Sequence, residues 1–343
     1  MKAELIEADS PAWDAALQRV RHDFYHLPGY VALSADDEGG VARALLVEDG
    51  PRGMLLPLVI RPIPGSTSDA TSPYGYPGPL VWGTDRPGFV SSAFAVGVEL
   101  LRSQGIVSLF VRLHPILDAE PPVGVGTLVT HGETVSIDLT LPSDELWANM
   151  RTNHRRDIGK ALRLGYTAHM DGRWEHFETF VRLYRETMER LAAEDRYMFD
   201  EAYFTRLRDA LGPSISLWAV MFEDVVAAGV LFVETAGLVQ YHLAGTDERY
   251  AHARPSKLLI HTVAGWAKER GDLRLHLGGG VGGADDSLMH FKAGFSDDRH
   301  VFRTLRVVVD EAEYGRLATA AGEAEDVADL GGFFPLYRKS RLG

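Results

Sequence analysis

Lys292 is the residue whose surroundings in the sequence are best suited to chemistry. It lies between aromatic residues in the segment Leu-Met-His-Phe-Lys-Ala-Gly-Phe (288–295), which follows a glycine-rich turn at 278–283. Glycine lets backbone approach a ligand closely, and a cation beside such a turn can face an anion or a developing negative charge. We therefore predict that Lys292 is a functional residue. The alternative is a surface lysine on a short amphipathic helix, in which Phe291 and Phe295 only pack.

A basic helix is the second candidate. The apolar spacing predicts one helix over 144–164, and its basic residues are Arg151, Arg155, Arg156, Lys160 and Arg163. At about 100° per residue, one stripe of this helix holds Trp147, Met150, His154, Ile158 and Ala161. The whole chain has a formal net charge of −13, so a local group of cations suggests contact with the phosphates of a nucleotide, a phosphorylated substrate or RNA. A solvated helix face is the alternative.

Three tyrosines could line a cleft. Tyr74 and Tyr76 stand in the loop Pro-Tyr-Gly-Tyr-Pro-Gly-Pro (73–79), and a loop restricted by glycine and proline suits a binding site. Tyr241 lies near the end of a predicted strand, where open α/β sheets often bind ligands. Packed aromatics in a turn and a buried structural tyrosine are the alternatives.

Several catalytic classes find no support in the sequence. The chain has no cysteine, which excludes disulfides, thiolate metal sites and a cysteine nucleophile. It lacks the paired histidines of a zinc protease helix, the Gly-x-Ser-x-Gly elbow of serine hydrolases and the phosphate-binding loop of ATPases. We therefore predict no metal site. No general base is obvious either, and Asp286 is the acidic candidate nearest to Lys292 in the sequence.

The composition is that of a soluble globular protein. Its 343 residues suffice for two domains, and 45% are hydrophobic while 24% are charged. The first nine residues include acidic side chains where a secretory signal needs an apolar run, and no segment is long and apolar enough to span a membrane. We expect a cytoplasmic protein without membrane insertion.

The same order of elements occurs twice along the chain. The first part reads as strands at 29–34, 41–48 and 54–61, a loop at 62–79, a helix at 88–103 and a strand at 106–113. The second part reads, after the basic helix, as helices at 174–193 and 200–211, strands at 215–223, 225–234 and 238–243, a helix at 256–270, and strands at 273–277 and 301–309. This pattern predicts an α/β fold with two similar units, each a mixed, partly parallel sheet flanked by helices.

Four segments resemble the FemABX-like branch of the acetyltransferase superfamily. These segments, which occur in the expected order, are Ser-Pro-Tyr-Gly-Tyr (72–76), Phe-Val-Arg-Leu-His-Pro (110–115), Asn-His-Arg-Arg-Asp-Ile-Gly-Lys-Ala (153–161) and Phe-Lys-Ala-Gly-Phe (291–295). The resemblance implies two tandem GNAT-like domains, at 1–140 and 141–309, with the segment 310–343 folding back onto the first.

The resemblance also implies an activity. The best-studied members move an amino acid from aminoacyl-tRNA to the free amine of a peptidoglycan precursor, and others modify peptide natural products. The family's Phe-Lys pair matches Phe291 and Lys292, which makes both catalytic candidates, with the lysine at the tRNA end or the reacting ester. Arg155, Arg156 and Lys160 would then hold phosphates, and Tyr74, Tyr76 and Tyr241, with Asp286, would belong to the substrate site.

Two departures from related sequences refine this hypothesis. Enzymes that use acetyl-CoA need a glycine-containing turn whose amides hold the pyrophosphate, and the matching segment 249–256 has no glycine but has Pro255. The segment 23–30 lacks the lysine with which peptidoglycan enzymes hold a nucleotide diphosphate. We therefore expect aminoacyl-tRNA as co-substrate, no bound cofactor, and a peptide-like amine acceptor such as an antibiotic intermediate. The alternatives are an acyl-CoA-dependent N-acyltransferase and a non-catalytic small-molecule-binding protein.

Overall fold

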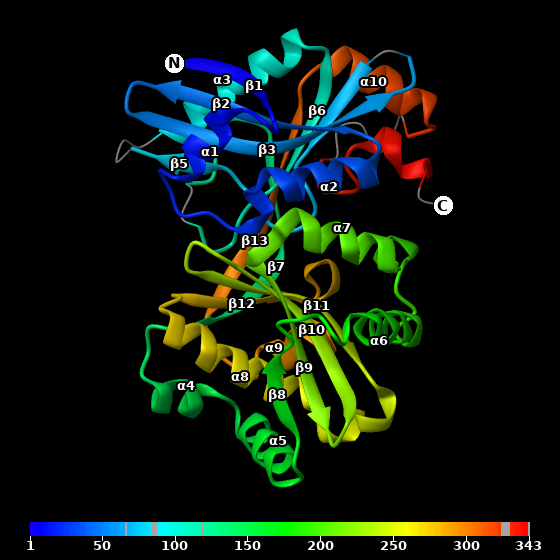
Figure 1. Cartoon of the computed structure of the whole chain (residues 1–343). Coiled ribbons are helices and arrows are strands. Elements are labelled where there is room, and N and C mark those ends of the chain that lie inside the picture. Colours follow the sequence, from blue (N-terminus) through cyan, green and yellow to red (C-terminus); the bar gives the residue numbers. More distant parts are fainter. Residues whose placement is uncertain (66, 84–87, 118–119, 324–329, 342–343) are drawn as a thin grey trace. The chain divides into compact units, whose positions relative to one another are not determined.

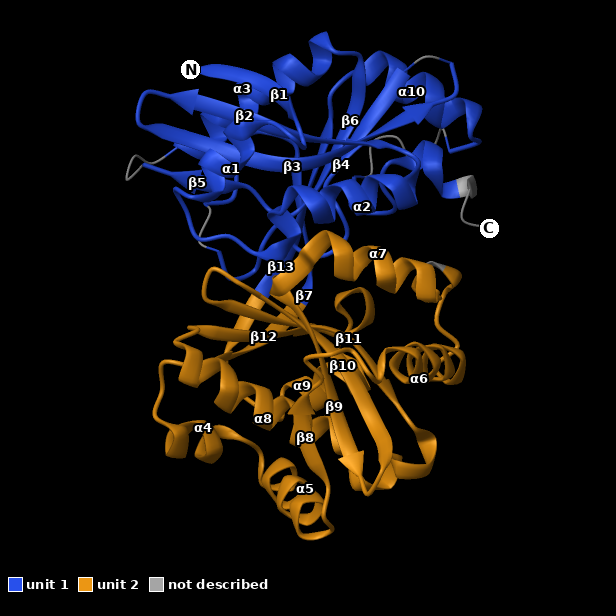
Figure 2. Cartoon of the chain, in the orientation of Figure 1, with its two compact units in different colours: residues 1–132, 301–343 blue, residues 133–300 orange. Residues whose placement is uncertain are grey.

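The computed structural model describes residues 1–65, 67–83, 88–117, 120–323 and 330–341, and the chain divides into two units (Figure 2). Unit 1 consists of residues 1–132 and 301–343, and unit 2 of residues 133–300. The strands β7 (Thr127–Asp138) and β13 (Arg299–Val308) each have residues in both units. The division thus falls within these two strands, whereas the sequence suggested boundaries after residues 140 and 309.

The sheet of unit 1 has the strand order β1-β2-β3-β4-β6-β13, with β5 paired to β3 (Figure 1). Its strands besides β13 are β1 (Lys2–Glu7), β2 (Val41–Asp49), β3 (Arg52–Ile63), β4 (Thr67–Thr71), β5 (Leu80–Trp82) and β6 (Ile106–Arg112). The pairing of β4 with β6 is parallel and the other pairings are antiparallel. The sheet is therefore mixed, as the sequence predicted.

Helices cover both faces of this sheet. They are α1 (Pro11–Leu17), η1 (Phe24–His26), α2 (Pro28–Glu38), α3 (Phe89–Ser103), α10 (Glu311–Ala320) and η7 (Leu336–Arg341). Alternate residues of a strand point to opposite faces. Leu45 of β2 accordingly packs with Phe94 of α3, whereas Leu46 packs with Trp13 of α1 and Val31 of α2.

The last part of the chain packs on unit 1. Tyr314 and Leu317 of α10 share a buried cluster with Phe334 and Tyr337, and this cluster includes Val107 of β6. The Tyr337 hydroxyl also lies 2.7 Å from the Ser108 hydroxyl. Residues distant in sequence are thus joined to strand β6, which lies between β4 and β13.

The sheet of unit 2 has the strand order β7-β12-β11-β10-β9-β8. Its strands besides β7 are β8 (Thr167–Met170), β9 (Ile215–Phe222), β10 (Val225–Thr235), β11 (Leu238–Thr246) and β12 (Arg274–Gly279). Only β11 and β12 pair in parallel among these neighbours. This parallel pair is connected through a helix, as such pairs require.

Helices also cover both faces of this second sheet (Figure 1). They are α4 (Ser143–Asn149), α5 (Thr152–Arg163), α6 (Phe177–Arg190), η2 (Asp195–Tyr197), α7 (Glu201–Leu211), η3 (Gly212–Ser214), η4 (Glu248–Ala253), α8 (Pro255–Arg270), η5 (Val281–Gly283) and α9 (Ser287–Lys292). Ala219 of β9 packs with Leu183 of α6, while the next residue, Val220, belongs to the main core with Leu259 of α8. The helices α6 and α8 therefore lie on opposite faces.

Three sequence predictions of secondary structure were wrong. Residues 29–34 form part of helix α2 instead of a strand, because Pro28 fits the first helical position and the buried residues follow helical spacing. The expected loop at 62–79 contains strand β4. The single helix expected at 144–164 is broken, because Met150 and Arg151 are extended, with ψ of 143° in both. None of the helices in the described part of the chain has the length and apolarity needed to cross a membrane.

Candidate functional site

The strands β11 and β12 separate at the centre of unit 2. Their parallel pairing covers only residues 238–240 of β11 and 274–276 of β12. Beyond this point β12 continues its pairing with β7, and β11 continues with β10 up to Thr246. The hydrogen-bonded pairing between β11 and β12 therefore ends at Gln240 and His276. Their carboxyl ends lie at the same edge of the sheet, where open α/β sheets bind ligands.

The chain after β12 turns sharply into helix α9. Gly278, Gly282 and Gly283 have positive φ angles of 74°, 63° and 85°, which favour glycine. At Gly280 an added Cβ would lie 2.5 Å from the Asp286 carboxylate, so this turn closes around Asp286. The carboxylate accepts hydrogen bonds from the backbone N–H groups of Val281 and Met289, at 2.9 and 2.8 Å.

Asp286 is thereby the N-cap of α9. Burial alone would raise the pKa of this carboxyl, but the backbone hydrogen bonds and the nearby Lys292 ammonium hold it below its ordinary value. A carboxylate with a low pKa is a weak base. These contacts suit Asp286 to fixing the turn, and its role in substrate binding stays a prediction.

Lys292 ends helix α9 and points into the protein. Only 7% of the residue is exposed, and its ammonium donates a hydrogen bond of 2.7 Å to the carbonyl oxygen of Gly279, at the end of β12. Burial lowers the pKa of Lys292 from 10.5 to about 8, and the Asp286 carboxylate opposes this shift. Lys292 is therefore not a surface lysine. It places a poorly hydrated cation beside the separating strands.

Phe291 and helix α5 are joined through His154. The His154 Nε2 donates to the Phe291 carbonyl oxygen at 2.9 Å, and the imidazole lies edge-on to Phe295, with ring centres 4.7 Å apart. Burial is the main cause that lowers the pKa of His154 to about 4, so the ring is neutral at pH 7. An added Cβ at Gly294 would lie 2.2 Å from this ring. The sequence placed His154 on an apolar stripe but did not indicate this link.

The basic residues of α5 differ in exposure. Arg155 is half-buried and its Nη1 lies 3.4 Å from the Ala148 carbonyl oxygen, whereas Arg156 and Lys160 are exposed. The acidic residue of this helix, Asp157, accepts a 2.8 Å hydrogen bond from the buried Lys257 of α8. The α5 cations are thus only partly neutralised within their own helix. Because His154 binds α9, this basic helix is attached to the element that carries Lys292.

Tyr241 lies on β11 directly after the three paired residues. It contacts Phe232 edge-on, with ring centres 5.5 Å apart, and burial raises the pKa of its hydroxyl above the ordinary value of 10. Tyr241 and Phe291 pack against the same buried core. Most of its ring therefore serves packing.

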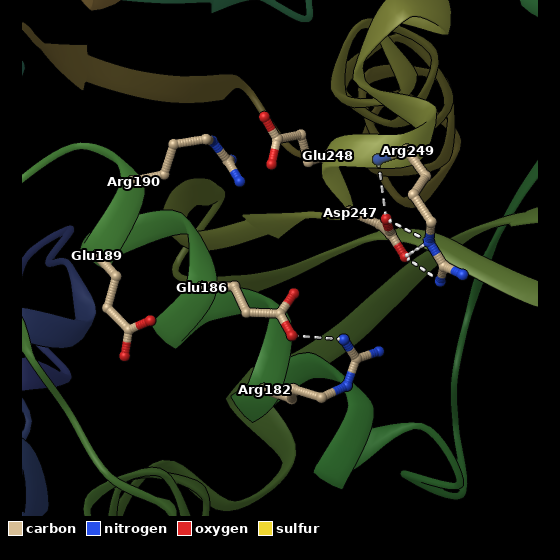
Figure 3. A pocket seen from close by; sticks show the side chains of 7 residues that line it. All are labelled: Arg182, Glu186, Glu189, Arg190, Asp247, Glu248 and Arg249. Carbon is tan, nitrogen blue, oxygen red and sulfur yellow. Dashed lines mark hydrogen bonds and ion pairs between the residues drawn. The ribbon is translucent and has the colours of Figure 1, made fainter.

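A polar pocket of about 500 Å³ opens beside the segment that follows β11 (Figure 3). Its lining residues come from α6 and η4 and are Arg182, Glu186, Glu189, Arg190, Asp247, Glu248 and Arg249. Arg182 pairs with Glu186 at 2.8 Å and Arg249 with Asp247 at 2.6 Å. Both arginine side chains are at least half exposed. The sequence had not indicated this pocket, because its residues are separated by more than fifty positions.

The loop that carries Tyr74 and Tyr76 belongs to unit 1 and is held tightly. Gly75 has a φ of 101°, and an added Cβ there would lie 2.1 Å from the Tyr25 ring. The Tyr30 hydroxyl donates to the Tyr74 carbonyl oxygen at 3.1 Å. Tyr74 itself is 47% exposed, and Tyr76 contacts Phe302 edge-on at 5.2 Å.

A buried polar network around Asp23, His26 and His114 holds the Gly78 end of this loop. The His114 Nδ1 accepts hydrogen bonds from the backbone N–H groups of Ile116 and Leu117. Its Nε2 therefore carries the proton and donates a hydrogen bond of 2.9 Å to the Asp23 carboxylate. His26 donates from Nε2 to the Gly78 carbonyl oxygen at 2.9 Å, and burial is the main cause that lowers its pKa to about 3. Both imidazoles are used for structure. The sequence motif at 110–115 contained His114 but gave no sign of its partner.

Within the described residues, no group of three or more His, Asp or Glu side chains is arranged to hold a metal ion. The structure thus brings Phe291, Lys292 and Asp286 together on α9 and its cap. It links α5 to them and places Tyr241 at the strand separation. Tyr74 and Tyr76 lie in the other unit. Their roles in substrate binding remain predictions.

Comparisons with known proteins agree with this architecture. The family model of the acetyltransferase (GNAT) domain matches residues 148–292. The crystal structure of FemX aligns with 92% of this chain and 99% of its own, with a TM-score of 0.69 at 14% identity. The chain has the FemABX-like GNAT fold. The predicted fold class is thereby confirmed.

Two further structures share this FemABX-like GNAT fold. The C-terminal domain of an Agrobacterium fabrum protein described as a lysylphosphatidylglycerol synthetase aligns with 93% of this chain and 98% of its own, with a TM-score of 0.54 at 14% identity. A Bacteroides thetaiotaomicron protein of unknown function aligns with 86% and 96%, with a TM-score of 0.54 at 8% identity. No curated protein sequence matches the chain significantly.

The broad enzyme class follows from these findings. The match to the acetyltransferase (GNAT) domain supports a transferase of acyl groups. The GNAT match covers the strand separation, the segment after β11, and α9 up to Lys292. The candidate site therefore lies in the part of the chain that the family model describes.

Proposed function

We propose that this protein is an aminoacyltransferase that takes an amino acid from aminoacyl-tRNA and forms a peptide bond with the free amine of a small peptide-like acceptor. The observation that carries the proposal is the buried ammonium of Lys292 beside the separating strands β11 and β12. A peptide natural-product intermediate is our preferred acceptor class, with a peptidoglycan precursor as the other.

The reaction balances without a cofactor. The acceptor's neutral amine attacks the carbonyl carbon of the ester that joins the amino acid to the terminal ribose. A C–N bond forms, the C–O bond to ribose breaks, and the proton lost by the amine ends on the ribose oxygen. Negative charge grows on the carbonyl oxygen during attack. A cation shielded from water stabilises that charge more than it stabilises the uncharged ester.

Lys292 suits this role in three respects. Among the residues that the structure describes, its ammonium donates one hydrogen bond, to Gly279, and an ammonium can donate three. Its pKa of about 8 leaves it protonated at pH 7. Its burial reduces competition from water. Phe291, the preceding residue, is tied to His154 and would help to fix the position of the lysine.

Two features of unit 2 support aminoacyl-tRNA, in place of acyl-CoA, as the donor. The exposed Arg156 and Lys160, with the half-buried Arg155, offer charge to tRNA phosphates on a helix joined to α9. The segment after β11 is poorly suited to a CoA pyrophosphate, because its N–H groups are used internally. Those of Arg249, Tyr250 and Arg254 bond to residues of the same segment. Pro255, which begins α8, has no N–H.

The test supplies a pool of radiolabelled aminoacyl-tRNAs and a panel of peptides with free amino termini, with half of each reaction pretreated with ribonuclease. The proposal predicts labelled peptide product only where the tRNA is intact. Ribonuclease-resistant transfer would contradict it, and so would the absence of product with every peptide tested.

The second candidate is an acyl-CoA-dependent N-acyltransferase, which the match to the acetyltransferase (GNAT) domain favours. It would use the same strand separation with an acyl thioester in place of the ester. Calorimetric titration distinguishes the two. Micromolar CoA binding, with transfer from acyl-CoA to an amine, would favour this candidate over aminoacyl-tRNA.

A further inference from the structure

Arg112 is a charged residue in the sheet of unit 1 that the transfer chemistry does not use. It is the last residue of β6 and pairs with Thr304 of β13. Since alternate residues share a face, Arg112 lies on the same face as Phe110, and Thr304 shares that face across the ladder. His131 also belongs here, because its Nε2 lies 2.8 Å from the Thr304 hydroxyl.

One edge of the Arg112 guanidinium is used by the protein. Its Nη1 donates to the Ser72 carbonyl oxygen at 2.8 Å and makes a longer contact of 3.4 Å with that of Pro73. These bonds fix the beginning of the loop that carries Tyr74. The guanidinium carbon lies 4.9 Å from the Phe110 ring centre and 6.0 Å from that of Tyr74. The cation is thus held between aromatic rings.

Within the described ranges of the chain, the charge of Arg112 has no carboxylate partner. Among the residues that the structure describes, no Asp or Glu forms an ion pair with it. Glu38 is its strongest acidic influence, but Glu38 pairs with Arg61 at 2.7 Å, and Arg61 also pairs with Asp69 at 2.8 Å. In this part of the chain as the structure describes it, Arg61 therefore has two carboxylate partners and Arg112 has none.

Burial makes this arrangement costly. Desolvation lowers the pKa of Arg112, although an arginine stays protonated under all ordinary conditions. The pKa of His131 is lowered too, by burial and by the nearby Arg306 and Arg112. An excess of positive charge in a partly buried place is destabilising unless an anion neutralises it. Arg112 remains partly exposed, so an anion from solution can reach it.

We propose that Arg112 is the centre of a binding site for the carboxylate or phosphate group of a small-molecule ligand. The Nε and Nη2 groups, which no hydrogen bond within the described residues uses, would face the two oxygens of the ligand in the fork geometry that arginine provides. The neutral His131 adds a polar ring beside the anion. Tyr74 would contact the part of the ligand next to it. The site needs no assumption about the transfer reaction.

The test uses benzoate, its uncharged analogue benzamide, and inorganic phosphate as probes of the full-length protein. Binding is followed by the NMR signal of the Arg112 Nε–H group, assigned by its loss in Arg112→Lys. The site predicts that benzoate or phosphate, or both, shift this signal in a saturable way and that benzamide does not. Which anion binds more tightly distinguishes a carboxylate ligand from a phosphate ligand.

Variants separate binding from loop anchoring. Arg112→Gln should weaken anion binding about tenfold or more, because it removes charge-assisted hydrogen bonds. The matched control Arg19→Gln, which removes an exposed arginine lying 5.7 Å from the Trp82 ring centre, should bind as the wild type does. If Arg112→Gln fails to fold, the shift of the Arg112 Nε–H signal in the wild-type protein still shows whether the anions bind at Arg112. Equal shifts with benzamide and benzoate, or no shift with either anion, would show that Arg112 only anchors the loop.

Discussion

Replacing Lys292 by methionine should remove activity and leave stability nearly unchanged. Burial lowers the pKa of Lys292 from 10.5 to about 8. Since one pKa unit corresponds to about 1.4 kcal/mol, keeping the ammonium buried costs about 3 kcal/mol relative to the unfolded chain. The same ammonium also satisfies the buried Gly279 carbonyl oxygen, and leaving that acceptor without a donor would cost about 1 to 3 kcal/mol. Methionine loses both effects and has a similar volume, so the free energy of unfolding should change by about 1 kcal/mol or less.

The effect on turnover should be much larger. Removing one preorganised donor from a developing oxyanion lowers kcat by about a hundredfold or more. The assay compares single-turnover transfer with the urea unfolding midpoint for Lys292→Met. Lys268→Met is the matched control, because Lys268 also donates to a carbonyl oxygen, that of Leu139 at 3.0 Å, and lies in the same unit. Full activity in Lys292→Met, or equal losses in both variants, would show that the Lys292 ammonium does not stabilise the oxyanion.

Three further predictions concern the same unit. The lowered pKa of Lys292 means that its ammonium loses its proton near pH 8, so the transfer rate of the wild type should decline as pH rises through about 8. Arginine stays protonated to higher pH, so in Lys292→Arg any remaining alkaline decline should move above pH 10. Identical pH profiles for the two proteins would argue against a role for a charged lysine. Changing Arg156 and Lys160 together to glutamate should weaken aminoacyl-tRNA binding about tenfold or more in filter-binding assays, and should reduce the salt dependence of that binding. The control Arg173→Glu, at a side chain that is 86% exposed, should have a small effect. Equal effects of the two changes would show that α5 does not belong to the tRNA-binding site. Asp286→Ala should lower the free energy of unfolding by about 1 kcal/mol at pH 7 through loss of the α9 cap. Because the pKa of Asp286 is held below its ordinary value, this difference from wild type should shrink as the pH falls through that lowered pKa and the wild-type carboxylate becomes protonated. A difference of constant size down to the acid limit of folding would contradict this capping role.

The sequence correctly predicted most of the helices and strands that have a strongly periodic apolar pattern. Strands β2, β9 and β10 and helices α3, α7 and α8 occur close to where apolar spacing and end signals placed them. Prediction failed where a tertiary contact decides the local structure. The backbone N–H of Arg151 bonds to the Gly294 carbonyl oxygen, and this distant contact accompanies the break between α4 and α5. No pattern within 144–164 could have shown it.

In the candidate site, too, the sequence showed the local features and did not show the contacts between distant residues. A lysine between aromatics after a glycine turn was visible locally, and the structure gives it a buried position. The partners of that lysine and of its neighbours were not visible, because hydrogen bonds such as those of His154 to Phe291 and of Lys257 to Asp157 join residues a hundred or more positions apart. Arg112 was part of a recognised motif, but only the contacts around it show an unpaired charge.

In the proposed reaction, an ester-linked amino acid passes from tRNA to an amine at the Lys292 site. The most direct measurement is a single-turnover reaction with excess enzyme, one purified aminoacyl-tRNA and an accepted peptide amine, which follows tRNA deacylation and amide formation in the same samples. We expect one amide to form for each tRNA deacylated, equal rates for the two processes, and the same slowing of both in Lys292→Met. Deacylation without amide, or amide formation that continues unchanged without Lys292, would contradict it.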